Sequence, residues 1–380
     1  MLTRIINRLS SRKEQIRAFA SDDIAAVIRL YNKVYRTTTL EPRGAFNEYW
    51  ENVFLGCPFF DSRTPSLVCE NADGQIIGFL GLMHRKCILQ ERSFDAVVPT
   101  NFMVDRELAS PTVALKLQRA CYAGAQHMTI TDGYNDLSSA IAKKMGGKVV
   151  PINSLIWIKY ISPIKFTLFQ TVLREVFPQV TAVISSFFDR VVDAVKREPN
   201  LPRKPNLEEQ QLTVEDVVEN SNWIFPRDFI RPQYDRKYTE WIFHLAGQRR
   251  RYGELQKRKV LDEKGNIAGW YIYYPNPGGI AYVLQLAAPE RTRGKVMDAL
   301  FWSCSHAGSL AVSGQVQPSW LRIFGEHRCY LEPGPYQTIC HSHNGEILDR
   351  ILTGRSSLSR LDMEFPVRFN EFVQRQQVPC

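Results

Sequence analysis

The sequence lacks paired cysteines and long uncharged hydrophobic runs. Its eight cysteines are scattered without a C-x-x-C pair, which excludes the common zinc and dithiol motifs and is typical of reduced thiols in a cytoplasmic protein. His341 and His343 have no spaced Cys, Asp or Glu residues to complete a ligand set, so we expect no metal site. In the most apolar region the longest charge-free run, residues 176–188, contains Pro178 and is shorter than the roughly 20 residues of a transmembrane helix.

Length and charge are ordinary for a soluble protein. The 380 residues are 44% hydrophobic and 23% charged, and a chain of this length normally forms two domains. The formal net charge of +9 suits an anionic partner, whether nucleic acid, a phosphate-bearing cofactor or a membrane surface, without choosing among them. No recognisable nucleic-acid module accompanies the basic residues, so we do not expect a nucleic acid partner.

Two segments lie outside the main pattern of the chain. Residues 1–14 place apolar side chains at helical spacing among basic ones, which predicts an N-terminal helical arm that docks on the protein or, alternatively, contacts a membrane surface. Residues 161–211 combine an apolar stretch with a proline-rich end and predict apolar helices followed by a linker. We expect these helices to cover a domain interface. The alternatives are a peripheral membrane contact and a site for an apolar substrate.

The first half of the chain alternates short apolar runs with amphipathic stretches. Asp73-Gly74 between two apolar runs is a strong hairpin signal. The expected strands cover about 15–19, 66–69, 76–82, 94–104, 128–131 and 155–160, and the expected helices about 24–34, 45–55, 111–121 and 137–145.

The second half repeats this order. The matched segments are residues 74–79 with 265–270, 109–114 with 291–296, and 128–131 with 310–313, the last two pairs at one constant offset. Because the register is kept across the whole interval, the pattern predicts one fold used twice. The predicted segments are an arm at 1–14, a first domain at 15–160, apolar helices and a linker at 161–211, and a second domain at 212–380.

This order of elements resembles the GNAT superfamily of N-acyltransferases. The family carries a cofactor signature, Arg/Gln-x-x-Gly-x-Gly/Ala, between its fourth strand and the next helix. Residues 291–296 read Arg-Thr-Arg-Gly-Lys-Val, which keeps the arginine and the first glycine and departs at Val296, whereas residues 109–114 keep only the final alanine. The resemblance implies an α/β fold of two GNAT-like domains, each a mixed, mostly antiparallel sheet flanked by helices. It also implies that the second domain holds the cofactor while the degenerate first domain shapes the acceptor cleft.

The cofactor implied by the resemblance is acetyl-CoA or another acyl-CoA, used as co-substrate. In the family its pyrophosphate sits on the helix N-terminus after the fourth strand. Its pantetheine arm pairs like an extra strand where two parallel strands diverge. Carried onto this chain, the cofactor-binding residues are Leu286 and Ala287 beside the thioester, and Arg291, Arg293, Gly294, Lys295 and Val296 around the pyrophosphate.

The family's usual proton donor is missing. The family often uses a tyrosine on the helix after the fifth strand, and the matching positions here are Ala142 and Phe324, neither of which has a proton to give. A neutral amine, a base and an acid are still needed for acyl transfer. The candidates are His327 and Tyr330 for the acid, and Tyr282 in the second domain or Asp95 in the first for the base.

The function that the resemblance implies is acetyl transfer from acetyl-CoA to an amine of a small-molecule or sugar-type acceptor, by direct attack in a ternary complex. O-acyl transfer is an open alternative. Two further classes also remain: a non-catalytic tandem module for binding or assembly, and an aminoacyl-tRNA-dependent, Fem-like peptidoglycan transferase. The net charge of +9 suits the last class, but its characteristic helical-arm insertion is not evident in the sequence.

Overall fold

The computed structural model describes residues 14–35, 43–163, 166, 202, 207–249 and 252–367. The chain forms two compact units. The first unit comprises Met1–Pro151, Arg227–Ala246 and Pro335–Cys380, and the second Ile152–Pro226 and Gly247–Gly334. The predicted N-terminal arm, apart from Glu14, and most of the predicted apolar segment at 161–211 lie outside the described residues.

The first unit is built on an eight-stranded sheet in the order β1-β2-β3-β4-β5-β15-β6, with β9 pairing on β3. Only β4 and β5 pair in parallel among the described strands of this sheet. The strands are β1 (Gln15–Ala18), β2 (Leu67–Glu70), β3 (Ile76–Leu89), β4 (Arg92–Val104), β5 (Met128–Tyr134), β6 (Lys148–Val149), β9 (Arg231–Pro232) and β15 (Gln337–His341).

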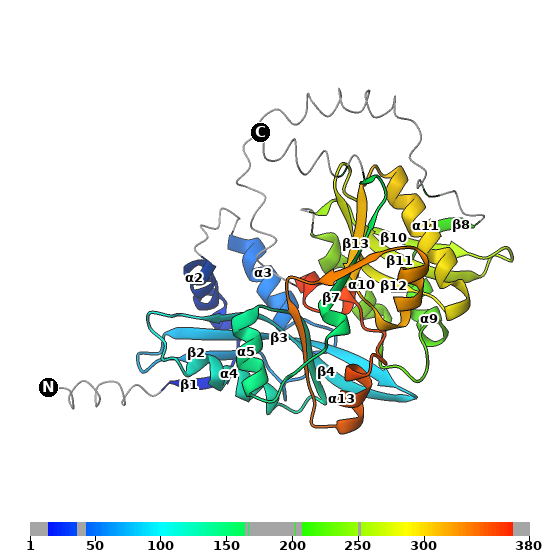
Figure 1. The fold of residues 1–380 in the computed structure, drawn as a ribbon. Coiled ribbons are helices and arrows are strands. Elements are labelled where there is room, and N and C mark those ends of the chain that lie inside the picture. Colours follow the sequence, from blue (N-terminus) through cyan, green and yellow to red (C-terminus); the bar gives the residue numbers. More distant parts are fainter. Residues whose placement is uncertain are drawn as a thin grey trace, which may run out of the picture. The chain divides into compact units, whose positions relative to one another are not determined.

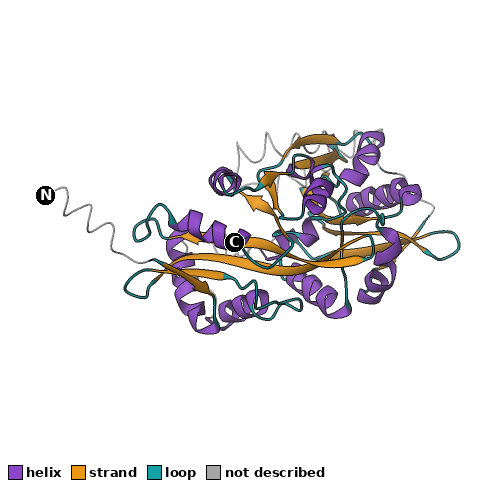
Figure 2. Cartoon of the chain, turned by 90° about the horizontal axis from the view of Figure 1, so that it is seen from below, coloured by secondary structure: helices purple, strands orange, loops and turns teal. Residues whose placement is uncertain are grey.

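Helices cover both faces of this sheet, seen in Figure 2 above and below the long strands. Helix α2 packs on β3 and β4 through its buried stripe of Ile24, Val27, Leu30 and Tyr31, which is the helical spacing expected from the sequence. Helix α4 packs on β2 and β3. The helices are α2 (Ile24–Tyr35), α3 (Arg43–Phe54), α4 (Val113–Tyr122), α5 (Asp136–Lys144), α10 (Arg236–Gly247) and α13 (Gly345–Leu352), followed by the short 3₁₀ helices η7 (Arg360–Asp362) and η8 (Phe365–Val367).

The second unit is built on a seven-stranded sheet in the order β14-β7-β13-β12-β11-β10-β8, in which β12 and β13 pair in parallel. Its strands are β7 (Leu155–Tyr160), β8 (Glu208–Gln211), β10 (Gln256–Leu261), β11 (Ile267–Tyr274), β12 (Ile280–Ala287), β13 (Ala311–Gln315) and β14 (Tyr330–Pro333). Its helices are η2 (Ile152–Ser154), α9 (Val214–Ile224), η5 (Glu290–Thr292), α11 (Arg293–His306), η6 (Pro318–Trp320) and α12 (Leu321–Glu326).

The resemblance places residues 291–296 between the fourth strand and the next helix. In the structure these residues follow β12 (Ile280–Ala287) and span η5 and the start of α11. Val296, Leu300 and Phe301 are buried in the core of the second unit, as their helical spacing predicts. Both sheets are mixed and mostly antiparallel with flanking helices, so the predicted fold class is confirmed.

The two repeats exchange their final strands. β7, from the first repeat, lies between β13 and β14 in the second unit, where its green arrow adjoins orange β13 in Figure 1. β15, from the second repeat, lies between β5 and β6 in the first unit. The units therefore differ from the predicted continuous domains at 15–160 and 212–380. A sequence repeat indicates which elements recur, but the sheet that a short apolar strand joins depends on tertiary pairing.

Candidate functional site

Among the described strands, each unit contains one pair of parallel strands that diverge. In the first unit β4 and β5 pair only at Ala96 with Met128 and Val97 with Thr129, and both strands continue beyond this point. β4 then contains a bulge relative to β3, where Asn101 adopts a left-handed backbone with φ of 50°. The divergence leaves room between the two strands for another chain or ligand.

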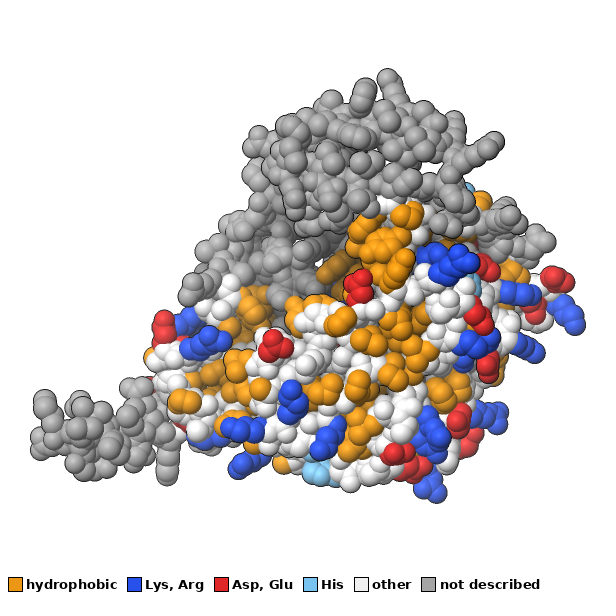
Figure 3. Space-filling model, viewed as in Figure 1, with side chains coloured by type: hydrophobic (Ala, Val, Ile, Leu, Met, Phe, Trp, Pro, Cys, Tyr) orange, Lys and Arg blue, Asp and Glu red, His pale blue; other side chains and the backbone are white. Residues whose placement is uncertain are grey.

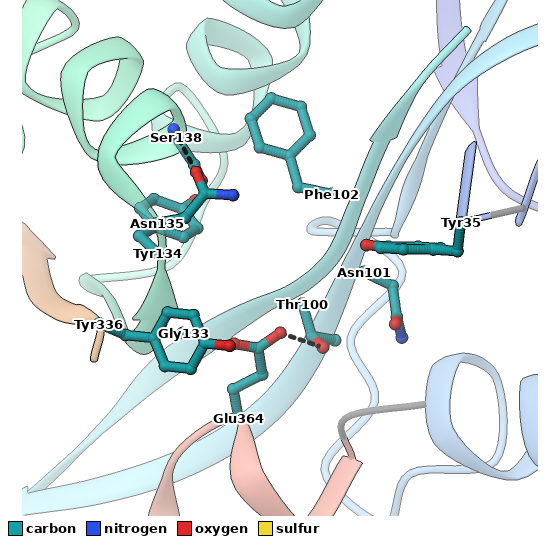
Figure 4. A pocket seen from close by; sticks show the side chains of 10 residues that line it. All are labelled: Tyr35, Thr100, Asn101, Phe102, Gly133, Tyr134, Asn135, Ser138, Tyr336 and Glu364. Carbon is teal, nitrogen blue, oxygen red and sulfur yellow. Dashed lines mark hydrogen bonds between the residues drawn. The ribbon is translucent and has the colours of Figure 1, made fainter. Parts of the chain in front are cut away.

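A cavity of about 210 Å³ occupies the divergence in the first unit (Figure 4). Its lining comes from β4, β5, the start of α5, the end of α2, the residue before β15 and residues 360–367, which we call the C-terminal segment. The lining residues are Tyr35, Thr100, Asn101, Phe102, Gly133, Tyr134, Asn135, Ser138, Tyr336 and Glu364.

A second cavity of about 290 Å³ adjoins the first and shares Tyr35, Phe102, Asn135 and Ser138 with it. It continues along β4 to Arg106 and to Ala114 in the first turn of α4, and its other lining side chains are mostly apolar. We call the two cavities together the first-unit groove. It extends from Glu364 at one end to Arg106 and the start of α4 at the other.

Hydrogen bonds tie the C-terminal segment to the wall of this groove. The Thr100 hydroxyl donates to the Glu364 carboxylate (2.9 Å). Asn101 donates from its side-chain nitrogen to the hydroxyl of Tyr49 (3.2 Å), which in turn donates to the carbonyl oxygen of Val367. The segment thus forms one wall of the cavity beside the bulge in β4.

A buried ion pair holds the same segment further back. Asp362 pairs with Arg85 (2.8 Å), and both side chains are at most 1% exposed. Asp362 also accepts a hydrogen bond from the hydroxyl of Tyr234 (2.6 Å), while Arg85 donates to the hydroxyl of Tyr238 (2.8 Å). These bonds partner all of the buried pair except Nε of Arg85, and they fix the backbone two residues before Glu364.

In the second unit a side chain closes the corresponding divergence. β12 and β13 pair from Ile280 to Val283, and β12 continues to Ala287. The N–H of Leu286 donates to Oε1 of Gln317 (3.2 Å), and Nε2 of Gln317 donates to the carbonyl of Leu286 (3.2 Å). An amide side chain offers one acceptor and a donor group, as a peptide does. Gln317, only 4% exposed, therefore takes both backbone groups that an additional strand would bind.

The counterpart of Gln317 in the first unit is Asn135, at the offset that aligns Leu310 with Met128. Both residues stand at the N-cap of the helical segment that follows the fifth strand of their repeat. The Asn135 side chain turns back to accept from the N–H (3.0 Å) and hydroxyl (2.7 Å) of Ser138, which caps α5. It therefore lines the groove instead of crossing it.

The predicted phosphate-binding residues lie in η5 and at the start of α11, and their side chains differ in availability. Arg291 and Lys295 are exposed. A Cβ added to Gly294 would meet only His327, at 3.9 Å. The buried Arg293 guanidinium donates to the carbonyls of Ser319 (2.6 Å) and Ala288 (3.3 Å), and burial lowers the pKa of Arg293. Arg293 is thus engaged with the protein itself.

The predicted catalytic residues of the second unit contact different neighbours. Tyr282 packs on Tyr252, with ring centroids 5.6 Å apart. His327 lies 3.0 Å from Asp298, a hydrogen bond that raises the pKa of His327 despite the opposing effect of burial. Tyr330 is 62% exposed on β14. These contacts do not assemble the three residues into one site, and their catalytic roles stay predictions.

In the first unit the described residues that line the cavity do not include the predicted base. Asp95 lies near Arg63 (3.8 Å) and is not among the residues that line the cavity. Tyr134 lines it, but its hydroxyl donates to Gln118 (2.9 Å), and burial raises its pKa well above the ordinary value of 10.0. Tyr134 is therefore neutral and already committed as a donor.

Sequence reasoning missed Glu364 and Tyr336. The charged residues Arg360, Asp362 and Glu364 alternate with the apolar Leu361, Met363 and Phe365, a pattern typical of an extended segment. The structure instead forms the 3₁₀ helices η7 and η8 there, so the pattern does not indicate the site. All six are buried.

The distribution of charged side chains on the described surface does not indicate where a site lies. On the face drawn in Figure 3, Lys and Arg side chains are interspersed with Asp and Glu rather than gathered into one basic patch. Within the described ranges no helix has the length and apolar character needed to span a membrane.

Known proteins resemble the chain in fold. A scan against protein-family models finds no match, and a search of curated proteins finds none either. Solved structures do match. A conserved protein of Enterococcus faecalis, described as a probable N-acyltransferase, has a TM-score of 0.56 at 11% identity over 90% of this chain and 75% of its own. GCN5-related N-acetyltransferases of Kribbella flavida (0.52, 10%, 88% and 72%) and Anabaena variabilis (0.56, 8%, 90% and 75%) are similar too. The predicted GNAT-like fold is confirmed.

Proposed function

We propose that this protein is an acyl-CoA-dependent acyltransferase and that the first-unit groove holds the cofactor. The observation that supports this most strongly is that β4 and β5 diverge and that a cavity lies between them, on a GNAT-like fold. The resemblance assigns the pantetheine arm to such a divergence. The bulge at Asn101 reshapes β4 at the point where the thioester would lie.

The two ends of the groove suit the two ends of an acyl-CoA. Arg106 and the first turn of α4, at Ala114, lie at one end. A guanidinium and the positive end of a helix dipole both favour a pyrophosphate. The other end holds Thr100, Tyr336 and Glu364, where the acyl group and the acceptor would meet.

The second unit is the alternative location, as the motif at residues 291–296 predicts. Two contacts disfavour it. Gln317 already bonds both backbone groups of Leu286, and Arg293 already donates to backbone carbonyls. A cofactor there would have to displace Gln317, leaving a buried amide to find new partners. Arg291, Gly294 and Lys295 nevertheless remain a predicted site that an experiment can test.

The reaction that this arrangement favours is transfer of an acetyl or other acyl group to an amine, by direct attack in a ternary complex. The 210 Å³ cavity is the size of a small molecule and presents amide and hydroxyl groups from Asn101, Asn135 and Ser138. Such groups bind the hydroxyls of a sugar-type or other polar acceptor. Holding acceptor and thioester together supplies much of the rate enhancement.

The proposal is tested by measuring the affinity for acetyl-CoA, longer acyl-CoAs and CoA by titration calorimetry. The same kind of substitution is made at the start of α4 and at the start of α11. We expect Ala114→Glu to weaken binding by about 100-fold, roughly 2.7 kcal/mol, because a carboxylate would face the pyrophosphate. Gly294→Glu should leave the affinity within about twofold of wild type. Ala114→Gln controls for size, and thermal unfolding checks that each variant folds.

The opposite pattern, with only Gly294→Glu losing affinity, would move the cofactor to the second unit. A wild-type protein that binds no acyl-CoA would overturn the proposed function. Binding without release of CoA in the presence of amines would favour the non-catalytic binding module.

A further inference from the structure

We propose that Glu364 is the catalytic base that removes the proton from the acceptor ammonium, an assignment that rests on the proposed acyl-CoA site in the same groove. Glu364 comes from the C-terminal segment, far from the residues that the family pattern marks. Among the described residues that line the 210 Å³ cavity, it provides the one formally charged side chain.

The position of Glu364 suits an ammonium group. The residue is 8% exposed, and Figure 4 shows its carboxylate reaching toward Thr100 and the hydroxyl end of Tyr336. A buried carboxylate attracts a cation more strongly than one in water, because screening is weaker there. The cavity therefore favours an acceptor that arrives as a primary ammonium.

The carboxylate is also held where the thioester would lie. Thr100, which donates to it, stands on β4 immediately before the bulge at Asn101. The N–H of Glu364 donates to Asp132 (3.2 Å), near the end of β5, so the residue spans the mouth of the divergence. Two residues earlier, the buried pair of Arg85 and Asp362 fixes the backbone. A base positioned by three separate contacts is preorganised for proton transfer.

The chemical step balances without any further reagent. Glu364 takes one proton from the ammonium, and the neutral amine attacks the thioester carbonyl to form a carbon–nitrogen bond. The tetrahedral intermediate expels the thiolate as the carbon–sulfur bond breaks. The nitrogen loses its second proton, the thiolate gains one through the hydroxyl of Tyr336 or water, and Glu364 returns its proton to solvent. The products are an amide, CoA and one released proton.

The test follows CoA release from acetyl-CoA with four amine probes: glucosamine, ethanolamine, spermidine and a glycine tripeptide. With the best probe, Glu364→Gln should lower kcat/KM by at least about 100-fold, the usual contribution of a general base. Its affinity for acetyl-CoA by calorimetry should stay within about threefold of wild type. Glu364→Asp should recover part of the rate.

Chemical rescue separates a base from a structural contact. Glu364→Ala should regain activity when acetate or formate is added, and sodium chloride at equal ionic strength should not restore it. Thr100→Val, which keeps the carboxylate and removes one contact, should lose about tenfold in kcat with little change in KM. This second variant keeps the test valid if Glu364 variants unfold.

The outcomes distinguish this assignment from the proposed function. If wild type binds acetyl-CoA and releases CoA while Glu364→Gln keeps the wild-type rate, Glu364 is not the base and the cofactor site stands. Loss of rate without rescue by either carboxylate, in a folded variant, also overturns the assignment. If none of the four amines supports CoA release, the assignment falls even where acyl-CoA binding stands.

Discussion

The two strand divergences differ in the direction of one amide side chain. Asn135 turns back onto its own helix, and a cavity lies in the divergence beside it. Gln317, at the matching position, reaches across to Leu286. The comparison teaches that a groove on this fold depends on what stands between the strands, and not only on the motif at the helix start.

The local sequence explains the two directions. Asparagine is among the best N-cap residues because its short side chain reaches the N–H groups of the first turn, and Asn135 bonds Ser138 in this way. Gln317 carries one more methylene group and precedes Pro318, and it makes no side-chain cap bond. Its amide is therefore available to the backbone of β12.

Replacing Gln317 with Met should have the largest effect on stability. The thioether keeps the volume but leaves the buried N–H and carbonyl of Leu286 without their partners, at a cost of about 1–3 kcal/mol for each group. We expect the free energy of unfolding, from urea titration, to fall by about 2–4 kcal/mol. Gln210→Met on exposed β8 is the matched control, with an expected change near zero. A loss for Gln317→Met under about 0.5 kcal/mol would mean that these bonds do not hold the second divergence closed.

Lengthening Asn135 to Gln should make the first unit resemble the second. The longer amide can reach the backbone of β4, as Gln317 reaches β12, so we expect the acyl-CoA dissociation constant to rise at least about tenfold, roughly 1.4 kcal/mol. Asn135→Ser keeps a capping side chain and should remain within about threefold of wild type. Equal affinity for both variants by calorimetry would contradict the idea that this position controls the groove.

The pair of His327 and Asp298 has the smallest expected effect on stability. Its hydrogen bond to Asp298 raises its pKa above the ordinary 6.5, so the pair stabilises the fold fully below that value and loses its effect as pH rises through the raised pKa. Because Asp298 is 57% exposed, we expect at most about 1 kcal/mol from it, removed by Asp298→Asn.

The same histidine reports on the start of α11. We expect NMR titration to give an unchanged pKa for His327 when CoA is added. An upward shift would instead place the cofactor's phosphates beside Gly294, the neighbour of the His327 ring.

Much of the architecture was predictable because local patterns suffice for it. The hairpin at Asp73-Gly74 precedes β3, and the stripe of Val296, Leu300 and Phe301 became the buried face of α11. Periodicity and turn chemistry act over a few residues, so they can be recognised without tertiary information. The constant offset between the halves then indicated a repeated fold.

The site was harder to predict because it depends on long-range contacts. The motif at 291–296 indicates a helix start with a glycine, and it carries no information on the rotamer of Gln317. Glu364 reaches the cavity only because β15 and the following segment join the first unit, and pairing between distant strands leaves no local signal.

The exchanged strands also set the order in which the protein can be completed during synthesis. The sheet of the first unit has a gap between β5 and β6 until β15, at Gln337–His341, has been made. At about 5–20 residues per second, synthesis of the chain from β6 to β15 takes on the order of tens of seconds. A ribosome that stops before β15 therefore releases a chain whose first sheet lacks an internal strand. The groove that carries the proposed chemistry is among the last parts of the molecule to be completed.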